Sequence, residues 1–164
     1  MSVSTRPARA NDAEALARIY NYYIRDSIIT FEEVEIAAAE MAERVTKVGK
    51  LSLPWIVAES EGALVGYAYA GPWRERSAYR FAVESTVYLD PSHIARGIGT
   101  QLYRDLLVRL RNTPMHTVIG GVALPNAASV ALHESLGFTK IAHFKDVGFK
   151  LGRWIDVGYW QLLL

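Results

Sequence analysis

Hydrophobic positions near the start of the chain repeat with the period of two helices. Asn11 followed by Glu14 is the pattern of a helix N-cap with a reciprocal acid, and apolar residues then keep helical spacing. That apolar series consists of Leu16, Ile19, Tyr20, Tyr23 and Ile24. A second helix is expected over residues 36–48, ending at Gly49. Residues 26–33 fit neither period, so we expect an apolar loop of the kind that often contacts ligands.

The middle of the chain carries strand patterns. Two β-rich runs at residues 55–60 and 63–70 are joined at Glu61 and Gly62, which predicts a hairpin. Residues 81–89 then alternate strictly, as expected of a strand with two different faces. One face is predicted to carry Phe81, Val83, Ser85, Val87 and Leu89, and the other Ala82, Glu84, Thr86 and Tyr88.

Helices and strands alternate in the second half of the chain. Apolar residues recur at every fourth position over residues 97–111, which predicts a helix. The other expected elements are a buried strand at 116–122, a helix at 126–136 and two strands at 139–144 and 155–163. The resulting order is strand, two helices, three strands, helix, strand, helix and two strands. It predicts an α/β (α+β) fold, a mixed sheet flanked by helices.

Length and composition narrow the class of protein. The chain has 164 residues, of which 51% are hydrophobic, and a formal net charge of +1. A chain of roughly 150 residues suits one hydrophobic core, so we expect a single domain over residues 1–164. The apolar fraction excludes disorder, and the near-neutral charge argues against binding of nucleic acid.

Several chemistries are excluded by residues that the sequence lacks. It contains no cysteine, which excludes disulfides, thiolate zinc sites and a cysteine nucleophile. His93, His116 and His143 are not spaced as metal ligands, so no metal is expected. No apolar run reaches the ~18 residues that span a membrane, and the first residues lack a signal-peptide core. We therefore expect a cytoplasmic protein that does not contact membranes.

A glycine-rich turn between a strand and a helix is the strongest chemical signal. Arg96, Gly97, Ile98, Gly99 and Thr100 combine a cation and a hydroxyl with glycines that let a ligand approach the backbone. The first turn of a helix also leaves N–H groups free and favours negative charge, so this turn is a candidate pyrophosphate cradle. The alternative is a turn that only packs its helix closely on the sheet. The lysine of a P-loop and the acidic residue of a dinucleotide fold are missing.

Two longer segments carry a resemblance to a known family. Residues 87–99 read VYLDPSHIARGIG, and residues 124–138 read LPNAASVALHESLGF. In this order and at this separation they resemble the two signatures of the GNAT superfamily of N-acetyltransferases. Residues 66–80, 83–88 and 147–154 resemble its phosphinothricin N-acetyltransferase branch. They read GYAYAGPWRERSAYR, VESTVY and VGFKLGRW.

The resemblance implies a fold and an activity. The fold would be the GNAT fold, with a mostly antiparallel sheet whose splayed strands hold acetyl-CoA. Members of the branch acetylate the α-amine of phosphinothricin, methionine sulfoximine or methionine sulfone. We therefore expect a homodimeric amino-acid N-acetyltransferase in which the amine attacks acetyl-CoA directly in a ternary complex. Two alternatives are an acetyltransferase for a protein N-terminus, lysine or polyamine, and a non-catalytic acyl-CoA-binding module.

The resemblance also implies cofactor-binding residues. The pantetheine arm of acetyl-CoA would pair with the backbone of Val87, Tyr88 and Leu89, and Asn126 would hydrogen-bond that arm. The pyrophosphate would lie on Ala95, Arg96, Gly97, Ile98, Gly99 and Thr100. The sequence departs from the family pattern at Ile94, where many members have Gln or Arg, and at Ala95, where many have Gly. One lost phosphate contact weakens binding by about 1–2 kcal/mol.

Glu84 and His133 are the expected catalytic residues. An α-amine has a pKa near ~8 and must lose a proton before it attacks, and Glu84 is the expected general base. A lone acid in a strand is otherwise a solvent-facing residue. His133 occupies the position at which most GNAT enzymes carry the tyrosine that protonates the departing thiolate. Its alternative role is that of a hydrogen-bonded helix histidine.

Substrate-binding residues are expected in three segments. Arg74 and Arg76 can bind carboxylate or phosphinate oxygens, although arginines in a loop are commonly only solvated. The other implied members of this site are Glu75, Tyr79, Glu84, Ser85, Thr86 and Phe31. Lys150 and Arg153 could reach the pocket of a partner subunit, but solvated charge at a strand end is the simpler reading.

Overall fold

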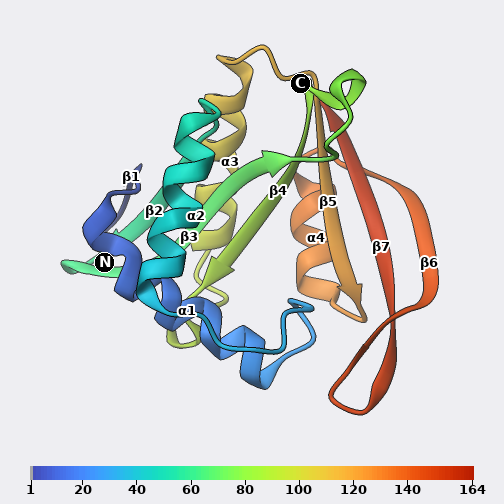
Figure 1. The fold of residues 1–164 in the computed structure, drawn as a ribbon, viewed down its shortest axis with the longest axis horizontal. Helices are drawn as coiled ribbons and strands as arrows, with labels where there is room; N and C mark the ends of the chain where they lie inside the picture. The colour runs from blue at the N-terminus through green and yellow to red at the C-terminus, as the bar shows by residue number, and fades with distance from the viewer. Residues whose placement is uncertain (1) are drawn as a thin grey trace.

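A seven-stranded sheet organises the computed structural model, which describes residues 2–164 (Figure 1). Across the sheet the strands are β1 (Val3–Pro7), β2 (Trp55–Ser60), β3 (Ala63–Pro72), β4 (Ala82–Leu89), β5 (Thr117–Leu124), β7 (Arg153–Leu163) and β6 (Thr139–Lys150). The helices are α1 (Ala13–Asp26), α2 (Ala38–Lys50), α3 (Ile98–Arg111) and α4 (Ala127–Ser135). Neighbouring strands are antiparallel except for β4 and β5. The predicted order of elements and the mixed, mostly antiparallel sheet are confirmed.

Helices cover both faces of this sheet. In Figure 1, α1 and α2 lie in front of it, and α3 and α4 lie behind it. The apolar rows of the helices face the sheet: Leu102, Leu106 and Leu110 of α3 are fully buried, as are Leu16 and Ile19 of α1. Each such side chain contributes roughly 1.5–3 kcal/mol by leaving water, so burial of these rows fixes the helices on the sheet.

The parallel strands β4 and β5 separate along their length. They pair only where Ala82–Glu84 face Thr117–Ile119, and beyond Glu84 they diverge, as Figure 1 shows. On their outer sides, β4 stays paired with β3 as far as Leu89 and β5 with β7 as far as Leu124. The facing edges of β4 and β5 are thus left without a strand partner. Backbone groups on such edges need another partner, which makes the gap a binding site for an extended ligand.

The expected start of the first helix is wrong by one residue: the N-cap of α1 is Asp12, where Asn11 was expected. Asn11 lies in a short 3-10 helix, η1 (Ala10–Asp12), and α1 begins at Ala13. The capping role falls to the neighbouring carboxylate: Asp12 accepts the backbone N–H of Arg9 at 2.7 Å and two hydrogen bonds from Arg6 of β1. A charge-assisted, bidentate contact from the preceding strand outweighs the local capping preference of Asn.

The second helix lies two residues later than expected at both ends. Residue 36 is held in the preceding loop because the Asn21 side chain bonds both the N–H and the carbonyl of Ile36, each at 2.9 Å. Gly49 does not end α2, which continues to Lys50. The chain turns after it, at Ser52, which has φ +56°.

The final hairpin is longer than the sequence pattern predicts. β6 runs from Thr139 to Lys150, with register shifts between Lys140 and Ala142 and between Phe144 and Gly148. These bulges interrupt the alternation of apolar and polar residues, which is why the pattern ends near Phe144. Two further short 3-10 helices, η2 (Ser77–Tyr79) and η3 (Pro91–His93), flank β4. No helix within residues 2–164 is both long and apolar enough to cross a membrane.

Candidate active site

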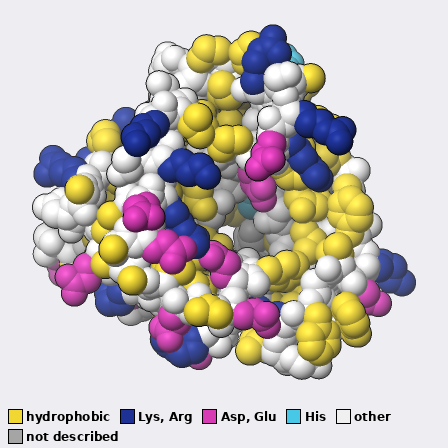
Figure 2. Space-filling view, in the orientation of Figure 1, with side chains coloured by type: hydrophobic (Ala, Val, Ile, Leu, Met, Phe, Trp, Pro, Cys, Tyr) yellow, Lys and Arg dark blue, Asp and Glu magenta, His cyan; other side chains and the backbone are white. Residues whose placement is uncertain are grey.

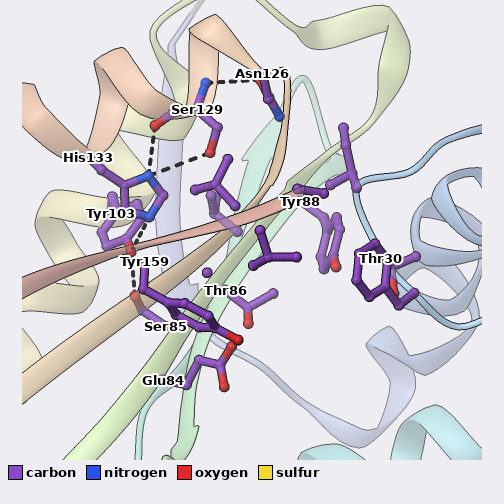
Figure 3. Close-up of a pocket in the computed structure, with 17 residues that line it drawn as sticks. Thr30, Glu84, Ser85, Thr86, Tyr88, Tyr103, Asn126, Ser129, His133 and Tyr159 are labelled. Carbon is purple, nitrogen blue, oxygen red and sulfur yellow. Dashed lines mark hydrogen bonds between the residues drawn. The ribbon is translucent and has the colours of Figure 1, made fainter. Parts of the chain in front are cut away.

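A cavity of about 250 Å³ opens where β4 and β5 separate. Figure 2 looks into a hollow at the centre of this face, with charged side chains around its rim. Figure 3 shows the residues that line the cavity, which come from β4, β5, β7, α3, α4 and the loop after α1. The residues used below are Thr30, Phe31, Glu84, Ser85, Thr86, Val87, Tyr88, Tyr103, Gly121, Asn126, His133 and Tyr159.

Glu84 lies in the wall of the cavity, at the last position where β4 pairs with β5. Burial raises the pKa of its carboxyl group, and the positive charge of Arg74 opposes that rise. Gly121 of β5 lies beside the carboxylate: a Cβ there would be in ordinary contact with Glu84 Oε1, at 3.4 Å, and in tighter contact with the Tyr159 ring, at 3.1 Å. In Figure 3, Tyr159 reaches the same carboxylate from β7. A half-desolvated carboxylate with a raised pKa suits proton abstraction from an ammonium group.

A buried chain of hydrogen bonds crosses the space behind β4. The Ser85 hydroxyl bonds the Tyr103 hydroxyl, which lies 3.0 Å from His133 Nε2. His133 Nδ1 is 2.7 Å from the carbonyl of Ser129, an atom that can only accept. Nδ1 therefore carries the proton, and Nε2 accepts from Tyr103. Burial also lowers the pKa of His133, so the imidazole is held neutral with its own proton bonded to the backbone.

The start of α3 is open to an anion. Gly97 occupies the N-cap position with φ +77° and provides no side-chain cap, so the N–H groups of the first turn remain available. Arg96 beside it is exposed. Ala95 also has a positive φ, +59°, in a region where a side chain is strained and glycine is not. The turn has the shape and charge of a diphosphate site.

The expected pantetheine residues lie along the gap between the strands. Val87 and Tyr88 line the cavity, whereas the carbonyl of Leu89 already accepts the Tyr23 hydroxyl at 2.6 Å. Asn126 caps α4 by accepting the Ser129 N–H at 3.1 Å, which keeps its amide nitrogen as a donor. Unpaired strand edge, cavity and open helix start together fit an extended thioester with a diphosphate at one end.

The expected substrate residues divide into two groups. Thr86 and Phe31 line the cavity together with Glu84. Arg74 is close enough to affect the pKa of Glu84, and its guanidinium lies 4.9 Å from the centre of the Trp73 ring. Three other expected residues, Glu75, Arg76 and Tyr79, lie exposed in the β3–β4 connection and do not line the cavity.

The Ser85 side chain lines the floor of the cavity, on the face of β4 that the alternation of the strand predicts. Successive residues of a strand point to opposite faces, so Ser85 faces α3, away from Glu84 and Thr86. Its hydroxyl is used by Tyr103, and only 6% of the residue is exposed. Ser85 therefore supports the floor of the cavity.

Functional residues that the sequence analysis missed are Tyr103, Tyr159 and the pair Gly120 and Gly121. A Cβ on Gly120 would lie 2.4 Å from His133 Nε2, and one on Gly121 would lie 3.1 Å from a Tyr159 ring carbon. Two glycines inside a strand signal close approach on both faces. Tyr103 follows Leu102 in the buried row of α3, where a hydroxyl requires a partner. Both signals were present in the sequence.

Lys150 is neither solvated nor directed toward a partner subunit. Only 3% of it is exposed, and its ammonium group donates to two backbone carbonyls of its own chain. Arg153, across the turn, is exposed.

A divergent pair of parallel strands, a carboxylate in the gap and an open helix start beside it define the class of acyl-CoA-dependent acetyltransferases. The family model described as "Acetyltransferase (GNAT) domain" matches residues 5–158. The chain belongs to this family.

Named relatives extend over nearly the whole chain. It is 41% identical over 159 residues to a phosphinothricin N-acetyltransferase of Streptomyces viridochromogenes, covering 97% of this chain and 86% of that protein. It is 33% identical to an L-methionine sulfoximine/L-methionine sulfone acetyltransferase of Salmonella typhimurium, covering 99% of this chain and 95% of that protein.

Solved acetyltransferase structures have the same fold. An acetyltransferase from Salmonella typhimurium with acetyl-CoA superposes with a TM-score of 0.98 at 33% identity, covering 100% of this chain and 95% of that one. A phosphinothricin acetyltransferase from Sinorhizobium meliloti in complex with acetyl-CoA gives 0.97 at 37% identity, covering 100% and 89%.

Proposed function

We propose that this protein transfers the acetyl group of acetyl-CoA to the α-amine of a small amino acid with a tetrahedral phosphorus or sulfur group. Phosphinothricin, methionine sulfoximine and methionine sulfone are the candidate substrates, as the names of its relatives suggest. One observation carries the proposal: Glu84 is a half-buried carboxylate at the point where β4 and β5 separate, with Arg74 near it. This arrangement offers a base for the amine and a cation for an acidic group of the same substrate.

Glu84 performs the proton abstraction in this proposal. At neutral pH an α-amine with a pKa near ~8 is mostly protonated, and a carboxylate with a raised pKa accepts its proton more readily. The neutral amine then attacks the thioester carbonyl, the N–C bond forms, the C–S bond breaks and coenzyme A leaves as a thiolate. A thiol has a pKa near ~8.5, so the thiolate is an adequate leaving group. Both reactants are held in one complex, and no acyl-enzyme is required.

The open strand edges and the turn before α3 would hold acetyl-CoA. The backbone of Val87 and Tyr88 would bond the pantetheine arm, with Asn126 donating to it from α4. The pyrophosphate would lie on the turn from Ala95 to Thr100. Acetyl-CoA bound at these places would supply the thioester to the cavity beside Glu84.

His133 supports the reaction through Tyr103 in this proposal. Since its protonated nitrogen is bonded to the Ser129 carbonyl, it fixes the Tyr103 hydroxyl at the floor of the cavity. It would therefore act as a positioning residue, and the departing thiolate would not need the imidazole as an acid.

We further propose a homodimer that acts in the cytoplasm, where acetyl-CoA is available. The outer face of the β6–β7 hairpin exposes a cluster of large apolar side chains, which monomeric proteins rarely leave in water. The cluster consists of Val147, Phe149 and Trp154, with Leu151 in the turn beside them. Sedimentation velocity should give a dimer for the wild-type protein and a monomer for Phe149→Glu. A wild-type monomer at micromolar concentration would rule out this arrangement.

Thiol release from acetyl-CoA tests the proposed reaction. The acceptors are phosphinothricin, methionine sulfoximine, methionine sulfone, ordinary amino acids and polyamines, and the three analogues should react best. Glu84→Gln should bind acetyl-CoA as the wild type does but lose turnover. Turnover with polyamines alone would exclude a site in which Arg74 binds an acidic group of the substrate. Equal binding with no turnover in either protein would instead indicate an acyl-CoA-binding module.

A further inference from the structure

The loop between α1 and α2 forms one wall of the cavity. This segment, residues 27–37, is called the acceptor loop below; it contains no helix or strand, and its residues 29–31 line the cavity. Irregular segments keep a fixed position only when side chains from elsewhere hold them. The contacts of the acceptor loop therefore decide the shape of this wall.

Side chains of α1 and α2 hold the acceptor loop on one side, and the tip of the β6–β7 hairpin holds it on the other. The second half of the loop is bound to the nearby helices: Asn21 of α1 bonds Ile36 twice, and Arg44 of α2 makes a bidentate contact to Glu32 at 2.8 and 2.7 Å. Thr30 is bonded on both sides, because its hydroxyl lies 2.9 Å from that of Tyr20 in α1 and its carbonyl accepts from Lys150. Phe31, like the Thr30 carbonyl, contacts the tip of the β6–β7 hairpin, more than a hundred positions away in sequence.

Lys150 makes the polar part of this contact. Its Nζ donates to the carbonyl of Thr30 at 2.8 Å and to that of Tyr23 at 3.2 Å. Tyr23 lies in the last turn of α1, where carbonyls lack helical partners and a positive charge is favourable. The ammonium group thus joins the end of α1 to the wall of the cavity.

Gly148 makes the apolar part of the contact. It lies two residues before Lys150 on the same buried face of β6, while Val147 and Phe149 point outward. A Cβ on Gly148 would lie 2.4 Å from the ring of Phe31, so the aromatic ring rests directly on the glycine backbone. Figure 1 shows the hairpin turn at the lower end of the sheet, near the loop that follows α1.

We propose that Lys150 is a positioning residue that holds Thr30 and Phe31 in place as the wall of the amine-acceptor site. A packing role alone does not explain the lysine, since burying an ammonium group is costly and an apolar side chain of similar length would fill the space. Its partners are carbonyls, which a cation can orient and an apolar residue cannot. The role in acceptor binding rests on the proposed acetyltransferase function; the effect on the loop does not.

Lys150→Met is the first test, because methionine keeps the length of the side chain and removes its hydrogen bonds. Lys145→Met, an exposed lysine of the same strand, is the matched control. Hydrogen exchange of the free protein should show residues 29–32 exchanging about tenfold faster in Lys150→Met, as expected from the loss of a charged hydrogen bond. Lys145→Met should exchange as the wild type does.

Steady-state kinetics tests the consequence for binding. In Lys150→Met, KM for the acceptor amine should rise about tenfold while KM for acetyl-CoA stays within about twofold, because the cofactor residues lie on β4, α3 and α4. Gly148→Ala should give the same pattern, since its methyl group displaces Phe31 from the other direction. Lys150→Arg, which restores donors, should recover part of the acceptor affinity.

Two results would overturn the proposal. One is unchanged exchange of residues 29–32 in a folded Lys150→Met protein. The other is an equal rise in both KM values in parallel with a lower melting temperature, which would mean that Lys150 serves stability alone. A wild-type protein that acetylates no acceptor, with exchange responding as expected, would reject the proposed function and leave the loop contact in place.

Discussion

His133 Nε2 lies 3.0 Å from the Tyr103 hydroxyl, and both side chains are buried between α3, α4 and β5. The Nδ1–H group of His133 donates a hydrogen bond to the Ser129 carbonyl, so Nε2 carries no proton. Tyr103 must therefore donate to Nε2 and accept from Ser85. The donors are therefore fixed along the chain, from Ser85 to Tyr103 to His133 to the Ser129 carbonyl. This arrangement fits a structural role in the cavity floor better than the role of an acid that protonates the coenzyme A thiolate.

Tyr103→Phe should lower the free energy of unfolding by about 1–3 kcal/mol, because it leaves His133 Nε2 and the Ser85 hydroxyl buried without a partner. Urea denaturation measures the change. Tyr22→Phe, at a tyrosine that is 37% exposed, is the control and should change stability by no more than about 0.5 kcal/mol. Equal stability of the two variants would contradict the chain of bonds.

Gly121→Ala should narrow the acceptor site. The added methyl group would lie 3.1 Å from a Tyr159 ring carbon, closer than an ordinary contact, and 3.4 Å from Glu84 Oε1, so the Tyr159 ring must shift beside the carboxylate. Because Glu84 is the proposed base, kcat/KM for the acceptor should fall about 10-fold or more, in line with the sensitivity of catalysis to small displacements. Gly71→Ala, where no atom lies within 4 Å of the added carbon, is the strand control and should leave kcat/KM unchanged.

The parts of the fold that the sequence predicted well are those set by local periodicity. α3 is one example: Leu102, Leu106 and Leu110 form a single buried row, and such a row has one solution against a sheet. The alternation of β4 likewise placed Glu84 and Thr86 on one face and Ser85 on the other. The general location of the site followed from the glycine-rich turn and from the family resemblance.

Side-chain contacts outside the local pattern account for the differences. Asn11 has the local preference for a cap, but the ion pair between Arg6 and Asp12, six positions apart, decides the helix start. Lys150 was interpreted as a strand-end charge because its partner, the Thr30 carbonyl, lies 120 positions away. A backbone acceptor leaves no trace in the side-chain pattern, so the contact of Lys150 could not be predicted from periodicity.

Asp12 should make stability depend on pH below neutrality. The hydrogen bonds from Arg6 lower the pKa of Asp12, so the folded state favours the ionised carboxyl group. Its stabilisation is therefore complete above the unfolded pKa of about 4 and is lost as the pH falls toward the lower folded value. Asp12→Asn should cost about 2 kcal/mol at pH 7, and the difference from wild type should shrink between pH 4 and pH 2.

Urea denaturation at several pH values measures the effect of Asp12. Asp26→Asn serves as control, since the Asp26 side chain is 46% exposed in its ion pair with Arg25. Exposed pairs contribute about 0–1 kcal/mol, so this variant should differ little from wild type at any pH. A difference for Asp12→Asn that persists undiminished at pH 2 would show that its charge is not the cause.

Arg74 should set the pH at which Glu84 becomes active. Burial raises the pKa of Glu84 above its ordinary 4.5, and Arg74 counteracts part of the rise. A general base works only when deprotonated, so kcat should increase with pH through this raised value. Removing the cation in Arg74→Gln must raise the pKa of Glu84 further, and the acid limb of the kcat profile should move to higher pH.

Two variants serve as controls for this shift. Arg76→Gln removes a cation of the same loop that does not affect the pKa of Glu84, so the acid limb should stay in place. Glu84→Gln should abolish the acid limb and lower kcat by about 10²–10⁴-fold. An acid limb that stays fixed in Arg74→Gln, or moves to lower pH, would mean that Glu84 is not the group that accepts the proton.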